Sequence, residues 1–308
     1  MMPAATNETR LERHMRSKYA CERIYSDDLI QKVTLPTRNN LTLAYVVHES
    51  ENETDANEEE TRVVLLMGYS YRKEDWAPTV DALMTQWEAS GVKSKLKDTL
   101  ALMDHLGWTQ AHIAGTSMGG MISQELALMA PKRVQSLSLV VSARGKFCPA
   151  YSALGPIIKS TSSSDVEVIT SCVVSFLYPA AFLDTPVGDS GSKTMREVLH
   201  VYHKYGSAAR GPPVTSGALG QTSALIFHFV SDERLLEIKG HGYPILIVGA
   251  KEDQAIDVSH AHHFQKMLTG THVTSKIYED AGHAVFLQYM DEVATDLLKV
   301  ICPAAAQS

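Results

Sequence analysis

A serine, an aspartate and a histidine occur along this 308-residue chain in settings suited to nucleophilic catalysis. Ser117 lies within Gly115-Thr116-Ser117-Met118-Gly119-Gly120, after the apolar run 111–114 and before the helical pattern 121–128. A Gly-x-Ser-x-Gly sequence between a strand and a helix forms a sharp turn that presents the serine hydroxyl at the strand tip. The turn strains the serine backbone, and glycines supply the small neighbours it requires. Ser117 is therefore a candidate nucleophile.

A serine hydroxyl needs a base within hydrogen-bonding reach, and the base needs an acid that orients it. Asp253 and His283 each come shortly after an apolar run with strand character. Parallel strands end at one edge of a sheet, so these side chains are expected to meet Ser117 there. Glu252 and Asp257 are alternative partners for the histidine.

Acyl transfer through a serine also needs two backbone N–H groups directed at the developing oxyanion. One is expected from Met118, directly after the candidate nucleophile. The other is expected from Tyr69, in the loop after the strand-like run 63–67. This chemistry implies no metal and no cofactor.

A histidine cluster, His260-Ala261-His262-His263, suggests a metal site because residues 260 and 263 share a helical face. No carboxylate or thiol completes a ligand set, so we interpret these histidines as surface residues.

The overall composition, 44% hydrophobic and 20% charged with a net charge of -7, is that of a globular protein without a nucleic-acid surface. The N-terminal residues contain no secretory signal, and no apolar run approaches the ~20 residues of a membrane helix. The cysteines are far apart, which argues against a zinc site or a disulfide framework and favours a cytoplasmic protein. They are Cys21, Cys148, Cys172 and Cys302.

Apolar periodicity predicts alternating strands and helices, as in a mainly parallel α/β sheet covered on both faces. The expected strands are 31–35, 41–48, 63–67, 111–114, 134–141, 244–248 and 273–278. The expected helices are 75–90, 96–106, 121–128, 258–268 and 284–300, with Gly107 ending the second. The acidic run 49–60 is interpreted as a solvated loop rather than an interaction tail.

These features resemble the α/β-hydrolase superfamily, in its branch of small esterases, lactonases and C–C-bond hydrolases. The similarity is carried by residues 98–108, by the turn at 111–120 and by Ala130-Pro131-Lys132-Arg133-Val134, and it spans about residues 31–301. The resemblance implies a serine hydrolase acting on a small apolar ester, thioester or lactone. The implied roles are nucleophile for Ser117, base for His283, orienting acid for Asp253, and oxyanion donors for Tyr69 and Met118.

The resemblance also implies a core interrupted by a helical cap. We expect a flexible N-terminus over residues 1–30, a core over 31–143 and 242–302, and a cap over 144–241. Aromatic residues in the cap suggest an apolar pocket, although they could equally be helix-packing core. Nothing in the sequence predicts the oligomeric state.

Two features depart from the family. Met67-Gly68 replaces the usual His-Gly and leaves the backbone donor intact. Between the helices 75–90 and 96–106 the family has another sheet strand and an Asp-x-Arg-Gly loop, whereas only residues 91–95 are present here. Five residues are too few for a strand and its turns, so a central strand is expected to be missing.

The expected loss of a strand leaves other functions open. One alternative is a non-catalytic member, either a ligand-binding protein or the product of a truncated reading frame. Another is an acyltransferase, in which the cap excludes water and an alcohol or thiol resolves the acyl-enzyme.

Overall fold

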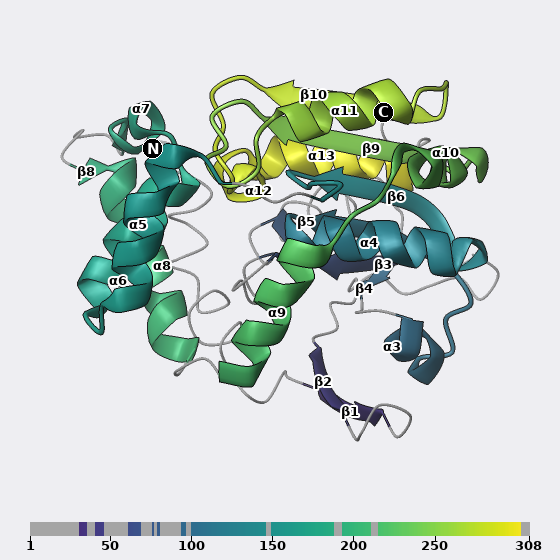
Figure 1. The fold of residues 1–308 in the computed structure, drawn as a ribbon, viewed down its shortest axis with the longest axis horizontal. Coiled ribbons are helices and arrows are strands. Elements are labelled where there is room, and N and C mark those ends of the chain that lie inside the picture. Colours follow the sequence, from purple (N-terminus) through teal and green to yellow (C-terminus); the bar gives the residue numbers. More distant parts are fainter. Residues whose placement is uncertain are drawn as a thin grey trace, which may run out of the picture.

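The computed structural model describes residues 31–35, 41–45, 61–68, 76, 79–80, 94–96, 100–145, 149–187, 193–210 and 215–302. A six-stranded sheet in the order β10-β9-β6-β5-β3-β4 lies at its centre (Figure 1). Every neighbouring pair in this sheet is parallel. The strands are β3 (Thr61–Leu66), β4 (Ser94–Leu96), β5 (Ala111–Thr116), β6 (Val134–Val140), β9 (Ile245–Ala250) and β10 (Val273–Tyr278).

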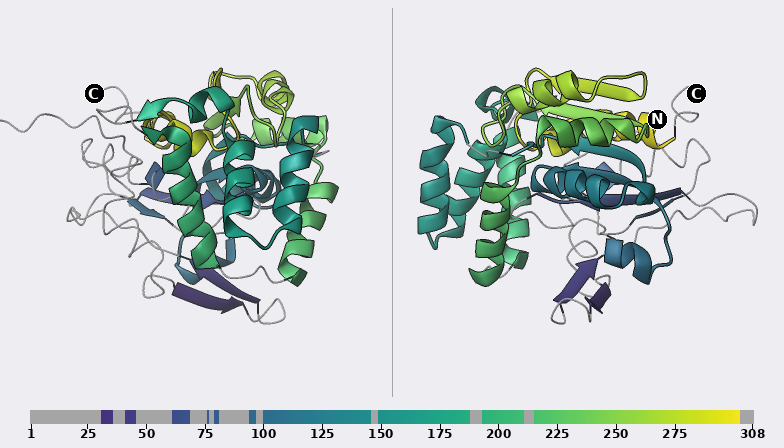
Figure 2. Two further views of the ribbon diagram at one scale, coloured as in Figure 1. Left: turned by 90° about the vertical axis from the view of Figure 1, so that its left-hand side faces the viewer. Right: turned by 45° about the vertical axis from the view of Figure 1, so that its right-hand side comes forward.

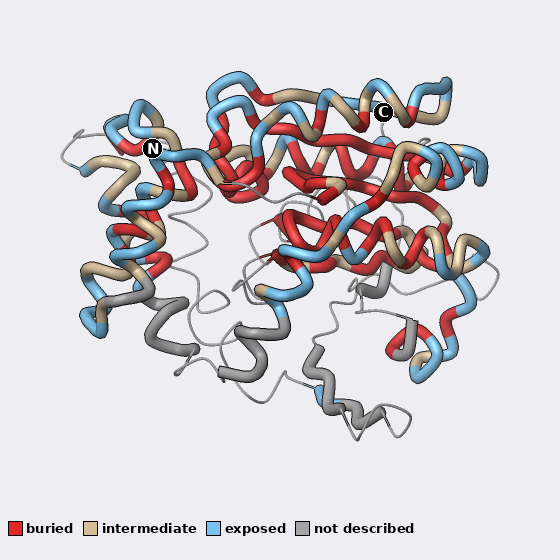
Figure 3. Tube along the Cα trace, viewed as in Figure 1, coloured by how far each residue is buried: buried red, intermediate tan, exposed pale blue. Residues whose placement is uncertain are grey.

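Helices cover both faces of the sheet. They include α3 (Leu100–His105), α4 (Met118–Met129), α10 (Asp232–Gly240), α11 (Ser259–Met267), α12 (Val285–Gln288) and α13 (Met290–Ile301). Ile245 and Ile247 of β9 pack in one hydrophobic cluster with α4, α10 and α11. Leu246 and Val248 pack in another with α12 and α13. Successive side chains of a strand point to opposite faces, so the all-apolar β9 is buried on both (Figure 3).

Most of the predicted elements are confirmed, within a few residues at their ends. The strands expected at 31–35 and 273–278 have those bounds, and β1 (Gln31–Leu35) pairs antiparallel with β2 (Leu41–Tyr45). Gly107, at φ 69°, follows α3 and ends it as expected. The predicted closing helix is divided into α12 and α13 at Tyr289. Most of the predicted helix 75–90 lies outside the described residues.

The expected absence of a central strand was wrong. Ser94–Leu96 forms β4, which pairs parallel with Thr61–Val63 of β3 at the edge of the sheet. The strand takes Leu96 from the residues predicted as helix, and α3 begins only at Leu100. The length argument failed because a three-residue strand needs few residues of its own. In the part of the chain that the structure describes, the β1–β2 hairpin forms a separate sheet.

Between β6 and α10 the chain forms mostly helices, at one end of the sheet (Figure 2). They are α5 (Tyr151–Ser162), α6 (Val166–Leu177), α7 (Ala180–Leu183), α8 (Met195–Arg210) and α9 (Thr215–Phe227). Pro186–Val187 (β7) and Lys193–Thr194 (β8) add an antiparallel pair too short to be detected by alternation. Because α10 contacts α4 and α11, we propose that the cap ends near residue 230 rather than at 241.

No helix within the described ranges is long and apolar enough to cross a membrane.

Candidate active site

The predicted turn at Ser117 has the expected strained geometry. Ser117 stands between β5 and α4 with φ 53° and ψ -121°, a conformation that non-glycine residues rarely adopt. Its N–H donates to Val140 O at 2.9 Å, and its carbonyl accepts from Gly120 N at 3.0 Å. These hydrogen bonds fix the turn while the side chain stays at the carboxyl edge of the sheet.

Close backbone approach explains the small residues around the serine. A Cβ atom on Gly119 would strike the carbonyl oxygen of Leu66, at the end of β3. A Cβ atom on Gly68 would lie 2.9 Å from Ser117 Cβ. Gly68, two residues after β3, therefore lies directly against the candidate nucleophile.

Ser142 also supports the turn, and sequence reasoning missed it. Its hydroxyl donates to Ser117 O at 2.9 Å, and the side chain is buried against Gly120. Val141 precedes it with φ 41°, an outlier for a β-branched residue. A lone serine after an apolar strand carries no sequence signal for this role.

Asp253 and His283 are brought together. Asp253 Oδ2 lies 2.7 Å from His283 Nδ1, and both side chains are almost completely buried. The other carboxylate oxygen accepts hydrogen bonds from the N–H groups of Ala255 and Ile256, at 2.8 and 2.9 Å. With both oxygens engaged, the carboxylate is held in one orientation and in turn orients the imidazole.

The alternative acids lie elsewhere. Glu252 is exposed, and Asp257 accepts from Ser259 N at 2.9 Å at the start of α11. Hydrogen bonds from Ser259 lower the pKa of Asp257. Of the three acids, it is Asp253 that contacts His283.

The two loops that carry this pair are tied to each other. Glu252 N donates to Ala281 O at 3.0 Å. Gln288 of α12 accepts from Gly282 N at 3.1 Å and donates to Asp280 O at 2.9 Å. Gln288 is a second supporting residue that sequence reasoning missed, because a glutamine on a helix is normally read as surface.

Met118 is the first residue of α4, so its N–H is among those that an α-helix leaves without an internal acceptor. The positive end of the helix dipole also lies there. Tyr69, the other predicted oxyanion donor, lies outside the residues that the structure describes. Its neighbour Gly68 is in contact with Ser117.

Among the hydrogen bonds of the described residues, none joins the Ser117 hydroxyl to His283. Hydrogen bonds between catalytic groups are often long when no substrate is bound. The missing hydrogen bond is therefore compatible with proton transfer from Ser117 to His283.

A buried apolar cluster begins at the residue after the candidate nucleophile. Met118 and Met121 of α4 form a buried cluster with Ala143, Leu225 of α9 and Ile256 of the Asp253 loop. The cap aromatics divide differently: Tyr178 is buried in the core cluster, whereas Tyr151 is 91% exposed. The buried apolar cluster that contains Met118, the residue after Ser117, thus draws on α4, α9 and the Asp253 loop.

Two of the three histidines of α11 have side-chain partners in the protein. His263 Nε2 lies 2.9 Å from Asp232 Oδ1, and His262 Nδ1 lies 2.9 Å from Gln265 Oε1. Within the described ranges there is no group of three or more His, Cys, Asp or Glu side chains that could hold a metal ion.

Comparison with known families matches two parts of the chain. Residues 68–157 match the family described as alpha/beta hydrolase fold, and residues 215–299 match the dienelactone hydrolase family. These segments contain all three candidate residues Ser117, Asp253 and His283.

Two curated proteins show different kinds of similarity. A putative carbamate hydrolase RutD of Agrobacterium fabrum is 24% identical over 276 residues, which cover 83% of this chain and 98% of that protein. The dihydrolipoyllysine-residue acetyltransferase component of the acetoin cleaving system of Pseudomonas putida is 54% identical over 54 residues. That match spans only 17% of this chain and 15% of the acetyltransferase component.

Solved structures share the fold along almost the whole chain. A hydrolase from Pseudomonas aeruginosa has a TM-score of 0.65 at 17% identity, covering 90% of this chain and 100% of its own. A meta-cleavage product hydrolase from Pseudomonas fluorescens has a TM-score of 0.60 at 17% identity. The match covers 85% of this chain and 95% of the chain of that hydrolase.

Proposed function

We propose that this chain, which belongs to the α/β-hydrolase superfamily, is a serine hydrolase that cleaves small apolar carboxylic esters, thioesters or lactones. The observation that carries the proposal is the buried 2.7 Å contact between Asp253 and His283, at the same sheet edge as the strained Ser117. The buried apolar cluster of Met118, Met121 and Leu225, which begins at the residue after Ser117, supports an apolar acyl group.

In the proposed reaction, Ser117 Oγ attacks the substrate carbonyl while His283 Nε2 takes the serine proton. Backbone N–H groups of Met118 and Tyr69 stabilise the oxyanion of the tetrahedral intermediate. The carbonyl–leaving group bond then breaks, and His283 returns the proton to the departing oxygen or sulfur. His283 then deprotonates a water molecule, whose oxygen attacks the acyl carbonyl of the acyl-enzyme. The bond from that carbonyl carbon to Ser117 Oγ breaks, the proton on His283 returns to Ser117 Oγ, and the acid leaves.

A direct test compares the parent chain and Ser117→Ala on p-nitrophenyl esters of increasing acyl length, together with a carbamate because of the named relative. We expect turnover by the parent and a loss of about 10³-fold or more in the variant. Ser160→Ala is the matched control and is expected to keep full activity. Ser160 is half-buried on α5, and its hydroxyl donates to Ile157 O within the same helix. Equal rates for the parent and Ser117→Ala would refute the assignment of Ser117 as the nucleophile.

Acyl transfer is a second candidate, because one short segment is similar to an acetyltransferase component. It predicts that an added alcohol or thiol diverts the acyl group into a new ester or thioester, at the expense of free acid. Product analysis with and without the acceptor separates the two reactions. The non-catalytic member, a ligand-binding protein or truncated product, is the third candidate. It was motivated by an expected missing strand, and β4, which pairs with Thr61–Val63 of β3, weakens that motive.

A further inference from the structure

A buried polar pair lies inside the apolar contact between α6 and α8. Tyr178, at the end of α6, and His203, on α8, are 1% and 2% exposed. The tyrosine hydroxyl lies 2.9 Å from His203 Nε2. Val174 and Leu199, from the same two helices, belong to the surrounding hydrophobic cluster.

The backbone beside Tyr178 rests on the loop that carries His283. Leu177 O accepts a hydrogen bond from Ala284 N at 3.2 Å. A Cβ atom on Gly282 would strike Leu177 O and lie 3.0 Å from Tyr178 Cα. The residues on both sides of His283 are therefore in contact with the C-terminal end of α6.

The hydrogen bond restricts how α6 can move. If α6 slid or turned relative to α8, the hydroxyl and the imidazole would both lose this hydrogen bond while buried from solvent. Such a loss costs more than the loss of an exposed hydrogen bond. Two apolar side chains could bury the same surface, but they would tolerate several relative positions of the helices. The pair thus fixes one position for the end of α6.

We propose that Tyr178 and His203 form a positioning pair that holds the end of α6 against residues 282–284 and so keeps His283 aligned with Ser117. The inference rests on the proposed function of Ser117 and His283. The pair acts through the backbone of residues 177–179, not by contact with reacting atoms. Because Gln288 and Glu252 also hold the loop, loss of the pair should loosen the base rather than release it.

The test uses Tyr178→Phe, which removes only the hydroxyl, and His203→Gln, whose amide can replace the lost hydrogen bond. Tyr243→Phe is the matched control. Tyr243 is also buried, and among the described residues its hydroxyl has no hydrogen-bond partner. It precedes β9, at the end of the sheet opposite the site. For each full-length variant, kcat, KM and the pH profile of kcat/KM are measured on a p-nitrophenyl ester, and unfolding is followed by calorimetry.

We expect Tyr178→Phe to lower kcat about 10–100-fold with little change in KM, because a base displaced by up to about 1 Å accepts the proton less efficiently. The pH profile should shift as well, because the proton-accepting nitrogen is no longer held in one place. His203→Gln should retain most of the parental kcat, because its amide can still bond to the Tyr178 hydroxyl. Tyr243→Phe should have the same kcat as the parent. A Tyr178→Phe variant that melts at a lower temperature but keeps the parental kcat and pH profile would show a merely structural pair and overturn the proposal.

A second measurement does not depend on turnover. The Nδ1 proton of His283, bonded to Asp253, gives a downfield imidazole resonance in proton NMR, assigned by its loss in His283→Gln. We expect this resonance to broaden or move in Tyr178→Phe and to stay unchanged in Tyr243→Phe. If the parent hydrolyses no ester, the proposed function fails, yet this comparison still decides the positioning role. An unchanged resonance in Tyr178→Phe would reject it.

Discussion

At the scale of single residues, the contacts of the Asp253 carboxylate suit the role of base that we propose for His283. One oxygen receives the backbone N–H groups of Ala255 and Ile256, and the other receives His283 Nδ1. This arrangement favours the tautomer with its proton on Nδ1, which leaves Nε2 free to accept the serine proton.

We predict that Asp253→Asn lowers kcat by about 10³–10⁴-fold with a small effect on KM, because an amide N–H facing Nδ1 would favour the wrong tautomer. Steady-state kinetics on a p-nitrophenyl ester measures this effect. Asp257→Asn, four residues further along, should stay within a few-fold of the parent. Equal losses in the two variants would contradict the assignment of Asp253.

The lowered pKa of His112 makes the free energy of unfolding depend on pH. Burial lowers the pKa of this side chain on β5 from 6.5 to about 4, and its Nδ1 lies 2.8 Å from Ser136 Oγ. The unfolded chain therefore takes up a proton at a higher pH than the folded chain, so stability is lost as the pH falls from 6.5 towards 4. The difference between these pKa values corresponds to about 3 kcal/mol. The slope of the unfolding free energy over this pH range should be shallower in His112→Gln, and an unchanged slope would show that His112 does not cause it.

At the scale of elements, the nucleophile turn depends on how closely α4 approaches β3. Gly119 touches the carbonyl of Leu66, so the first turn of the helix and the end of the strand meet backbone to backbone. This contact sets the height of Ser117 above the sheet. It leaves no space for a side chain at position 119.

We predict opposite effects for the same substitution at two helical glycines. Gly119→Ala should destabilise the protein by at least 1–3 kcal/mol, as expected for overpacking, or prevent folding. Gly155→Ala, in α5 with open space around its Cβ, should stabilise the protein by about 0.5–1 kcal/mol. Denaturant unfolding of both variants tests this, and a neutral Gly119→Ala would mean that the close approach is not required.

The sequence-based prediction succeeded where one local pattern decides the structure. The all-apolar β9 and the glycine-flanked Ser117 have one reasonable interpretation each. It failed for β4, whose three residues are stabilised by pairing with β3 and carry no periodicity of their own. Ser142 and Gln288 were missed for a related reason, since their roles exist only through contacts with residues distant in sequence.

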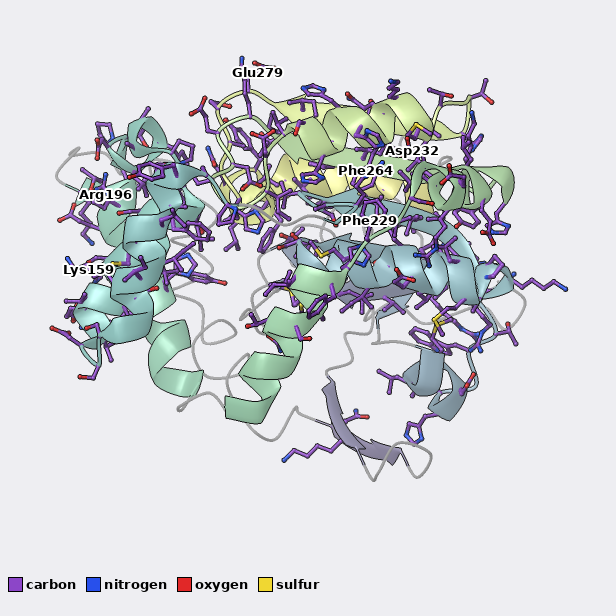
Figure 4. All side chains as sticks on the ribbon, viewed as in Figure 1. Lys159, Arg196, Phe229, Asp232, Phe264 and Glu279 are labelled. Carbon is purple, nitrogen blue, oxygen red and sulfur yellow. The ribbon has the colours of Figure 1, made fainter. Side chains whose placement is uncertain are left out.

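At the scale of the whole molecule, the proposed cap joins the proposed core through two adjacent chain segments. Val230 N donates to Arg144 O at 2.7 Å, and the Arg144 guanidinium lies 5.0 Å above the ring of Phe229. Arg144 also forms an ion pair with Asp232, which lies near Phe229 at the start of α10 (Figure 4). Hydrogen bonds from His263 and Arg144 lower the pKa of Asp232, so this carboxylate is charged at neutral pH.

We predict that Asp232→Asn loosens this junction. Amide hydrogen exchange should become faster in α5, α6 and α8, with KM affected more than kcat because the cap, not the chemistry, is disturbed. Asp184→Asn breaks the exposed ion pair with Arg196 and is expected to change neither property. Exchange rates that are equal in the parent and in Asp232→Asn would show that the ion pair does not hold the cap.

Covalent labelling of Ser117 by a fluorophosphonate, read by intact mass, tests directly whether Ser117 is a nucleophile activated by His283. We predict one adduct on the parent chain, none on Ser117→Ala, and slow labelling of His283→Ala, because the probe reacts only with a serine activated by a base. A parent protein that melts cooperatively yet forms no adduct, or an adduct that persists in Ser117→Ala, would contradict this prediction.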